Sequence, residues 1–369
     1  MPQSAPPLRT LILGGGVAGC ALASALRGTP CGASVTVVER RVDAAAAGMG
    51  FLLLPNGIAA LREIAPEVDW LHAGRRIVSV QLLTHAGEML AEPAIAPSLC
   101  VSRVRFLSLL RGAVGDARWL EGVAATSLDR SHDGSFSAAR LDDGASLEAD
   151  AFFVCDGASS RLRAQAFPHA RLSDVIVQEV VSTAHAPLLA RALGSTFRKF
   201  HAADGGLAVG LLAESDEKIV WFVQFDSRRH AAPSRDAIGP FVRRLLADFA
   251  PDVQRAMDAT DFTTSHLWPT RDLEPLDDIR VRNLALVGDA AHACLPFTSQ
   301  GANGALEDAA ALKRLLSRAT TDAEIEAELA RYSAHGRQQR HRVFAEGRRL
   351  REAFLQPLAA AMPAIPLVS

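Results

Sequence analysis

The sequence predicts an α/β fold, in which a parallel sheet is covered by helices, a second β-rich unit is inserted into the chain, and helices form the C-terminal end. Three observations lead to this prediction. A glycine-rich turn joins a short apolar run to an alanine-rich stretch near the N-terminus. Two later apolar runs are each followed closely by an aspartate. Segments with strand-like alternation lie between them, whereas the last third has helical spacing.

The size and composition of the chain fit a globular protein of two domains. At roughly 100–200 residues per domain, a chain of 369 residues predicts two. With 49% hydrophobic and 22% charged residues, the chain is not expected to be disordered. The net charge of -2 provides no basic field for nucleic acid or an anionic membrane. No apolar run reaches the roughly 18 residues of a membrane helix.

The five cysteines are scattered along the chain and form no CxxC pair. This pattern argues against a disulfide framework and against a zinc site, so we expect no metal. A reducing, cytoplasmic environment fits the pattern best.

The first element is a strand–turn–helix–strand unit. Residues 11–13 are apolar, residues 14–19 are GGGVAG, and residues 20–27 are rich in Ala and Leu. A β-branched run over 34–38 ends at Glu39. Glycines let the backbone approach a pyrophosphate, the helix N-terminus offers free N–H groups, and the carboxylate can accept hydrogen bonds from a ribose. The unit predicts a dinucleotide site; a glycine-rich turn in an unrelated α/β domain is the alternative.

The same stretch has a competing interpretation. Residues 10–26 are uncharged, and residues 17–20 (VAGC) look like a lipoprotein cleavage site, which would imply export and a lipid anchor. A buried parallel strand with a glycine-rich turn has the same composition. The motifs farther along the chain favour the dinucleotide-binding turn over the cleavage site. In that interpretation, Gly19 and Cys20 are part of the turn and cannot be a cleavage site.

Two segments, 77–89 and 195–225, have the pattern of a β-sheet. In the run over 219–225, Trp221 and Phe225 share one face and Phe222 and Gln224 share the other. Phe225 and Gln224 therefore cannot both line one pocket directly. For Trp221, a place in the sheet core is at least as good an interpretation as stacking on a ligand.

Two further motifs follow buried strands. The strand over 151–154 precedes CDGASSRLR with Asp156, and the strand over 284–287 precedes GDAAH with Asp289. Pro296, QGAN at 300–303 and EDA at 307–309 come next. Open α/β sheets bind ligands at the carboxyl ends of their strands. Asp156 can serve the linking region of a dinucleotide, Asp289 can accept bonds from polyhydroxyl groups, and the helix that starts near Gly301 presents a positive dipole end.

In this order the three motifs resemble the flavoprotein aromatic hydroxylases of the para-hydroxybenzoate hydroxylase type, over nearly the whole chain. The resemblance implies a Rossmann-like FAD-binding domain of the glutathione reductase type, an inserted mixed β-sheet substrate domain and C-terminal helices. We expect the discontinuous FAD-binding domain at 1–75, 100–170 and 268–369, and the substrate domain at 76–99 and 171–267.

The resemblance also implies the residues that contact FAD. The segment 102–107 resembles the family's arginine before a helix, and residues 48–51 and 55–57 lie where the family has a loop beside the flavin. The expected FAD contacts are Gly14, Gly16, Val17, Ala18, Gly19, Glu39, Arg40, Gly50, Arg103, Asp156, Asp289, Pro296, Gly301, Ala302 and Asn303.

The implied reaction is a monooxygenation. NADH or NADPH reduces FAD, O2 adds to the flavin to give a C4a-hydroperoxide, and one oxygen atom hydroxylates a small aromatic or heteroaromatic substrate. Backbone N–H groups near Gly301 would stabilise negative charge on the reduced flavin, and Pro296 would wall the reacting side of its ring. The sequence has no second dinucleotide fingerprint, so NAD(P)H is expected to bind transiently.

Two departures from the family affect the expected chemistry. Ser299 stands where the family often has Gly, and Tyr332 is the only tyrosine, so the prototype's tyrosine relay is not expected here. Either the substrate needs no phenol ionisation or a histidine deprotonates it, and His201, His266 and Pro296 are the candidates for a catalytic role. Structural hydrogen bonding is preferred for His292. The candidate substrate contacts are Phe222, Gln224, Phe225 and Phe297.

Other functions on the same fold stay open. A flavin halogenase would need a WxWxIP segment, and the four tryptophans, at 70, 119, 221 and 268, are far apart. An FAD-dependent reductase or cyclase of an isoprenoid-type substrate would prefer a larger apolar tunnel. A non-catalytic flavin-binding protein is the remaining alternative.

Overall fold

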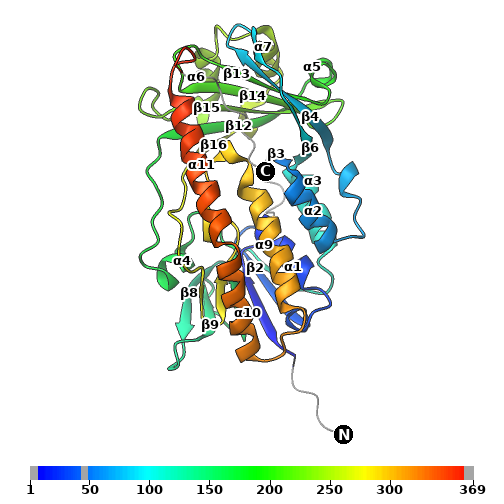
Figure 1. Cartoon of the computed structure of the whole chain (residues 1–369), viewed down its shortest axis with the longest axis vertical. Coiled ribbons are helices and arrows are strands. Elements are labelled where there is room, and N and C mark those ends of the chain that lie inside the picture. Colours follow the sequence, from blue (N-terminus) through cyan, green and yellow to red (C-terminus); the bar gives the residue numbers. More distant parts are fainter. Residues whose placement is uncertain (1–6, 43–48, 361–369) are drawn as a thin grey trace.

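A computed structural model describes residues 7–42 and 49–360 and confirms the predicted α/β fold class. Figure 1 shows a lower unit built on a six-stranded sheet and an upper unit built on a nine-stranded sheet, with helix α11 (Arg337–Leu355) running alongside both. Gly48 of the expected flavin-side loop lies outside the described residues.

The six-stranded sheet brings the three sequence motifs to one edge. Its strand order is β17-β18-β11-β1-β2-β7, and all neighbours are parallel except β17 and β18. The strands are β1 (Arg9–Leu13), β2 (Ser34–Glu39), β7 (Arg118–Glu121), β11 (Ala151–Val154), β17 (Arg280–Val281) and β18 (Leu284–Leu286). Because the motifs follow β1, β11 and β18, which are neighbours, the motifs converge at the carboxyl ends of these strands.

Helices cover this sheet because its central strands are buried on both faces. Helix α1 (Val17–Leu26) packs against α9 (Gln300–Leu316) and α3 (Arg103–Gly112), and α10 (Asp322–His335) packs against α9. Shorter helices are α2 (Pro55–Ile64), α4 (Arg161–Ala166) and α8 (Asp289–His292). A three-stranded antiparallel sheet of β8 (Ala125–Arg130), β9 (Phe136–Leu141) and β10 (Ser146–Glu148) packs against α4.

The nine-stranded sheet has the order β16-β12-β15-β14-β13-β4-β6-β3, and β5 pairs with β4. The strands are β3 (Gly50–Leu53), β4 (Arg75–Thr84), β5 (Met89–Ala91), β6 (Ala94–Ser102), β12 (Val177–His185), β13 (Thr196–His201), β14 (Leu207–Ala213), β15 (Lys218–Asp226) and β16 (His266–Pro269). β13 pairs with β4 in parallel and β3 pairs with β6 antiparallel, so the sheet is mixed. β3 lies entirely in a segment that the sequence assigned to the FAD-binding domain, and the ends of β4, β6 and β16 also reach into such segments.

The two faces of this sheet have different neighbours. Trp221 and Phe225 point into a core closed by α5 (Pro187–Leu193), α6 (Ile238–Leu245) and α7 (Pro251–Asp258), which lie above the sheet in Figure 1. On the other face, Val177 and Ala208 pack against Phe297 and the C-terminal turns of α11. The second face is therefore the one that meets the six-stranded unit. No helix of the described residues is long and apolar enough to cross a membrane.

The glycine that follows strand β18 allows α1 and α9 to pack closely against the end of that strand. Gly288 follows β18 with a φ of +60°, a conformation that L side chains rarely adopt. A Cβ atom at this position would lie 2.9 Å from the Cβ of Ala18 and 3.0 Å from the Cβ of Ala305. Only glycine fits both the backbone conformation and the space.

We expect Gly288→Ala to lower the free energy of unfolding by about 3 kcal/mol, because backbone strain and overpacking add. Gly134→Ala is the matched control, since Gly134 also has a positive φ (+85°) but open space around it. The control should lose only about 1 kcal/mol. Urea denaturation measures both values, and equal losses would contradict the close approach at Gly288.

Candidate active site

The glycine-rich turn after β1 is shaped by two close backbone contacts. Gly14 has a φ of +118°, and a side chain there would overlap the carbonyl of Cys155. A Cβ atom on Gly19 would overlap the carbonyl of Gly14. These contacts press the first turn of α1 against β1 and β11, as the strand–turn–helix prediction requires. Val17, Ala18 and Cys20 are buried in that helix, which places Cys20 in the core of the domain.

Gly16 is different, because its surroundings are open. A Cβ atom there would meet only the guanidinium of Arg103, at 3.9 Å. Gly16 is also the N-cap of α1, and it has no side chain that could satisfy the free N–H groups of the helix. The N-terminus of α1 is thus available to an anion.

Glu39 and Arg103 lie beside this helix end. Glu39 is buried at the end of β2 and accepts hydrogen bonds from the N–H groups of Gly15 (2.7 Å) and Arg41 (2.9 Å). Arg103 begins α3, and burial lowers its pKa although Asp289 opposes that effect. Among the described residues its guanidinium has no hydrogen-bond partner, whereas Arg40 is exposed. A partly buried guanidinium without a partner suits an anionic ligand.

Asp156 carries an unsatisfied buried oxygen. It follows β11, burial raises the pKa of its carboxyl group, and its Oδ1 has no hydrogen-bond partner among the described residues. The motif's arginine, Arg163, makes no hydrogen bond to this oxygen and donates instead to the carbonyls of Ala158 (2.6 Å) and Ala290 (3.1 Å). Arg163 therefore joins the second motif to the third, a role that the sequence does not reveal.

The third motif places Asp289 against the start of α9. Burial raises the pKa of the Asp289 carboxyl group, and its Oδ1 lies 3.6 Å from the position of a Cβ on Gly301. Gly301 and Ala302 are in the first turn of α9, whose first N–H groups have no partner within the helix. Pro296 begins the short helix Pro296–Thr298 just before it. Ser299, where the family often has Gly, adopts a left-handed conformation with a φ of 54°.

Two residues expected at the flavin have structural roles as well. The side chain of Asn303 is fully buried, donates to the carbonyls of Leu52 (3.0 Å) and Ser299 (2.7 Å), and accepts from the N–H of Leu54 (2.9 Å). It thereby holds the loop between β3 and α2. Gly50 belongs to β3, where a side chain would overlap Val220 of the nine-stranded sheet.

These observations test whether the turns fit a dinucleotide such as FAD. The glycine-rich turn, Asp156, Asp289 and the start of α9 follow neighbouring strands of one sheet. They present two helix N-termini, a partly buried guanidinium without a partner and a buried unpaired carboxylate oxygen. A phosphate-linked, polyhydroxyl ligand would satisfy each of these groups, so the residues fit the cofactor.

The nine-stranded sheet presents four polar side chains toward this unit: Glu179, Lys199, His201 and Gln224, called here the buried polar cluster. Lys199 donates to the Oε1 of Gln224 (3.1 Å), whose Nε2 donates to Glu179 (2.8 Å). Burial raises the pKa of Glu179 to about 7 and lowers the pKa of Lys199 to about 8. Sequence reasoning selected Gln224 and His201 but missed Glu179 and Lys199.

Cross-strand register explains how the cluster forms. His201 pairs with Ala208, Ala208 with Gln224, and Gln224 with Glu179, so three polar side chains share one row of the sheet. Phe222, partly exposed, lies in the next row with Lys199. Along β13, Phe197, Lys199 and His201 are two residues apart and therefore share one face of the strand. That spacing was the available sequence signal.

The remaining candidates lie apart from the cluster. Phe225 packs against Phe241 of α6, with ring centroids 5.1 Å apart, on the opposite face of the sheet. His266 is on the edge strand β16 and is exposed beside Trp268. Tyr332 donates from its hydroxyl group to the carbonyl of Leu286 (3.1 Å), in the core of the six-stranded unit. Of the predicted substrate contacts, Phe222, Gln224 and Phe297 come together and Phe225 does not.

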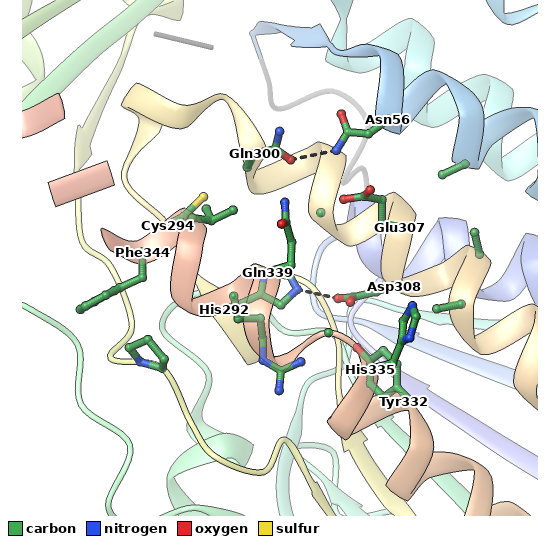
Figure 2. Close-up of a pocket in the computed structure, with 18 of the residues that line it drawn as sticks. Asn56, His292, Cys294, Gln300, Glu307, Asp308, Tyr332, His335, Gln339 and Phe344 are labelled. Atoms are coloured by element: carbon green, nitrogen blue, oxygen red, sulfur yellow. Dashed lines mark hydrogen bonds and ion pairs between the residues drawn. The ribbon is translucent and has the colours of Figure 1, made fainter. Parts of the chain in front are cut away.

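A separate cavity of about 380 Å³ lies between α2, α9, α10 and α11. Figure 2 shows Asn56 and Gln300 joined at one end of it by a hydrogen bond of 3.0 Å. Deeper in, the Nε2 of His292 lies 2.7 Å from the Oδ2 of Asp308, which also accepts from the N–H of Gly288. His292 thus makes a structural hydrogen bond.

The pair of His292 and Asp308 should make stability depend on pH. Burial alone would lower the pKa of His292, but the carboxylate of Asp308 outweighs it and the pKa is raised. The stabilisation is therefore fully present below the unfolded pKa of about 6.5 and is lost as pH rises through the folded pKa. Each unit of elevation corresponds to about 1.4 kcal/mol.

The measurement is the free energy of unfolding of the native protein and of His292→Gln, from about pH 6 to about pH 9. The native protein should lose more stability over this range than the variant does. Parallel curves would show that the ion pair contributes nothing.

Comparison with known proteins confirms the resemblance seen in the sequence. The family described as FAD binding domain matches residues 8–346. Aurachin C monooxygenase/isomerase of Stigmatella aurantiaca is 27% identical over 340 residues, which cover 89% of this chain and 84% of that protein. 3-amino-4-hydroxybenzoate 2-monooxygenase PtmB3 of Streptomyces platensis is 28% identical over 332 residues, covering 85% and 81%.

A solved structure shares the fold over almost the whole chain. Klebsiella pneumoniae HpxO complexed with FAD and uric acid superposes with a TM-score of 0.81 at 21% identity. The alignment covers 94% of this chain and 88% of that one.

Proposed function

The chain belongs to the FAD binding domain family, and from that premise we propose that it is an FAD-dependent monooxygenase. It uses NADH or NADPH and O2 to hydroxylate a small aromatic or heteroaromatic compound. The observation that carries the proposal is the meeting of three ligand-binding turns with a sheet face that has both aromatic and ionisable side chains. The relatives named above support it, because they include monooxygenases and a protein crystallised with FAD and uric acid.

Several residues would hold FAD. The N-terminus of α1 at Gly16 would receive the pyrophosphate, Glu39 the ribose and Asp289 the ribityl hydroxyls. Arg103, with a partly buried guanidinium that has no partner, and Asp156, with a buried unpaired oxygen, would complete the contacts. When bound, FAD supplies hydride acceptance and oxygen activation, which no side chain can provide.

The chain's own residues orient the reactants and exclude water. The first N–H groups of α9, at Gly301 and Ala302, stabilise negative charge at the helix N-terminus. Phe222, which is partly exposed, presents its ring on the substrate side, where a planar compound can stack and displace water. Pro296 begins the short helix just before α9 and would wall the reacting side of the flavin ring.

The reductant is proposed to bind transiently at the surface. Arg40 and Arg41 are exposed beside Glu39 and can attract a phosphate from solution. We also propose a cytoplasmic location, because scattered cysteines without a pairing pattern suit a reducing compartment.

The decisive experiment measures NADH and NADPH oxidation by the purified protein with aromatic acids, phenols, indoles and quinolones. We expect the protein to carry FAD, and one class of compound to stimulate oxidation and to gain an oxygen atom from isotopically labelled O2. If NAD(P)H fails to reduce the bound flavin with every compound, the proposal is wrong and a non-catalytic flavin-binding role is favoured.

Replacement of Arg103 tests the cofactor site separately from activity. Arg103→Met should weaken FAD binding by about 10- to 100-fold, since a hydrogen bond to a charged group is worth about 1.5–3 kcal/mol. Arg105→Met is the matched control, because Arg105 lies on the same helix, is exposed and donates to the carbonyl of His72. Flavin fluorescence titration of the apoproteins gives both dissociation constants; equal values would remove Arg103 from the site.

A further inference from the structure

Lysine is rare in this protein. The chain has only three lysines, Lys199, Lys218 and Lys313, among 39 basic residues, so arginine supplies nearly all of its positive charge. Lys218 is exposed, and Lys313 donates to the carbonyls of Glu63 and Ile64. Lys199 is different, because it is only 2% exposed and lies in the middle of a sheet.

The surroundings of Lys199 leave part of its hydrogen-bonding capacity unused. Its ammonium group has three donor hydrogens, and among the described residues one partner accepts from it, the Oε1 of Gln224. Its Nζ lies 5.8 Å from the ring centroid of Phe222 and 5.7 Å from that of Phe297. These rings come from the sheet and from the segment just before α9, so the ammonium group lies where the two units meet.

The neighbours of Lys199 fix its position without neutralising it directly. Gln224 is held at both ends, because its carbonyl accepts from Lys199 and its amide donates to Glu179. The side-chain amide of Gln224 thus lies between the carboxylate of Glu179 and the ammonium group of Lys199. His201, on the same strand, has a buried Nε2 without a partner among the described residues, and burial lowers its pKa well below the usual value. It stays neutral and does not add a second cation.

We propose that Lys199 binds an ionised oxygen of the substrate, so that the enzyme selects aromatic compounds that carry a carboxylate, phenolate or enolate group. This inference rests on the proposed function and names its substrate class. The ring of such a compound packs against Phe222, which is partly exposed, and its charged oxygen accepts a hydrogen bond from the free donors of Lys199. A buried cation that lacks a direct counter-ion gains most from an anionic ligand.

The chemistry of lysine suits this role better than that of arginine. An ammonium group is compact enough to fit between two phenyl rings, whereas a guanidinium needs a wider, planar site. Burial also lowers the pKa of Lys199 to about 8, so the group can exchange a proton near neutral pH. The oxygen of a phenolate or enolate also makes the conjugated ring richer in electrons, whereas a carboxylate would serve binding alone.

The test compares matched ligands on the holoenzyme by isothermal titration calorimetry. Benzoate is paired with benzamide to probe a carboxylate, and 4-nitrophenolate with nitrobenzene to probe a phenolate. We expect at least one anion to bind about 10- to 100-fold more tightly than its neutral partner, as a charge-assisted hydrogen bond predicts. The arm that shows the preference identifies the acidic group. Equal binding within both pairs overturns the inference without the need for any variant.

Three lysine variants then assign the preference. Lys199→Met should abolish it while leaving the affinity for the neutral ligand unchanged, and Lys199→Arg should retain part of it. Lys218→Met, which removes an exposed lysine from β15, should behave as the native protein. If Lys199→Met does not fold, as judged by its FAD content and thermal melting, Lys199→Gln takes its place. If a variant without the charge of Lys199 still binds the anion more tightly than its neutral partner, the assignment of this preference to Lys199 is wrong.

The same preparations separate this inference from the proposed function. Holoenzyme that oxidises NAD(P)H with a neutral aromatic compound, but shows no preference for anions, would retain the function and reject the role of Lys199. Protein that prefers anions through Lys199, but whose flavin NAD(P)H cannot reduce, would retain the binding site and reject the monooxygenase.

Discussion

The close approach of two helices to the end of one parallel sheet is the constraint on which this structure depends. Gly14, Gly19 and Gly288 lie where a side chain would collide with a neighbouring carbonyl group or with a methyl group from another element. Because these glycines have no side chains, α1 and α9 can begin immediately beside the ends of the strands. Both helices then begin at the carboxyl edge of the same sheet, where their first N–H groups have no partner within the helix.

The three motifs at this edge are also joined to one another by side chains. Arg163 of the second motif donates to a carbonyl of the third, and Asp308 of α9 accepts from the N–H of Gly288 and pairs with His292. Asn303 fastens the loop between β3 and α2 to the start of α9. These bonds hold loops that are distant in sequence in one arrangement, as a site must be held if it is to orient a cofactor without reorganisation.

The two units contribute different kinds of chemistry. The six-stranded unit offers backbone N–H groups and carboxylates, which suit phosphates and hydroxyl groups. The nine-stranded sheet offers the buried polar cluster and partly covered aromatic rings, which suit a small planar compound with an acidic group. Phe297 belongs to the first unit in sequence, but it packs with Val177 and Ala208 of the second unit and with Phe354 of α11. That contact couples the position of α9 to the face of the sheet.

The sequence by itself determined the fold class, the three turns and their ligand. Glycines followed by a helix, and aspartates after buried strands, depend on local backbone geometry, so their spacing along the chain is sufficient evidence. The direction of side chains in the nine-stranded sheet could be predicted only in part. Alternation separated Phe225 from Gln224, but it could not say which of them faced α6.

Only the tertiary structure decided the rest. The placement of β3 in the nine-stranded sheet, the bridge made by Arg163 and the meeting of Glu179 with Lys199 all depend on strand register and on contacts between residues far apart in the chain. Register is set by how whole faces pack, and no local pattern within a strand encodes which residue of another strand will lie opposite.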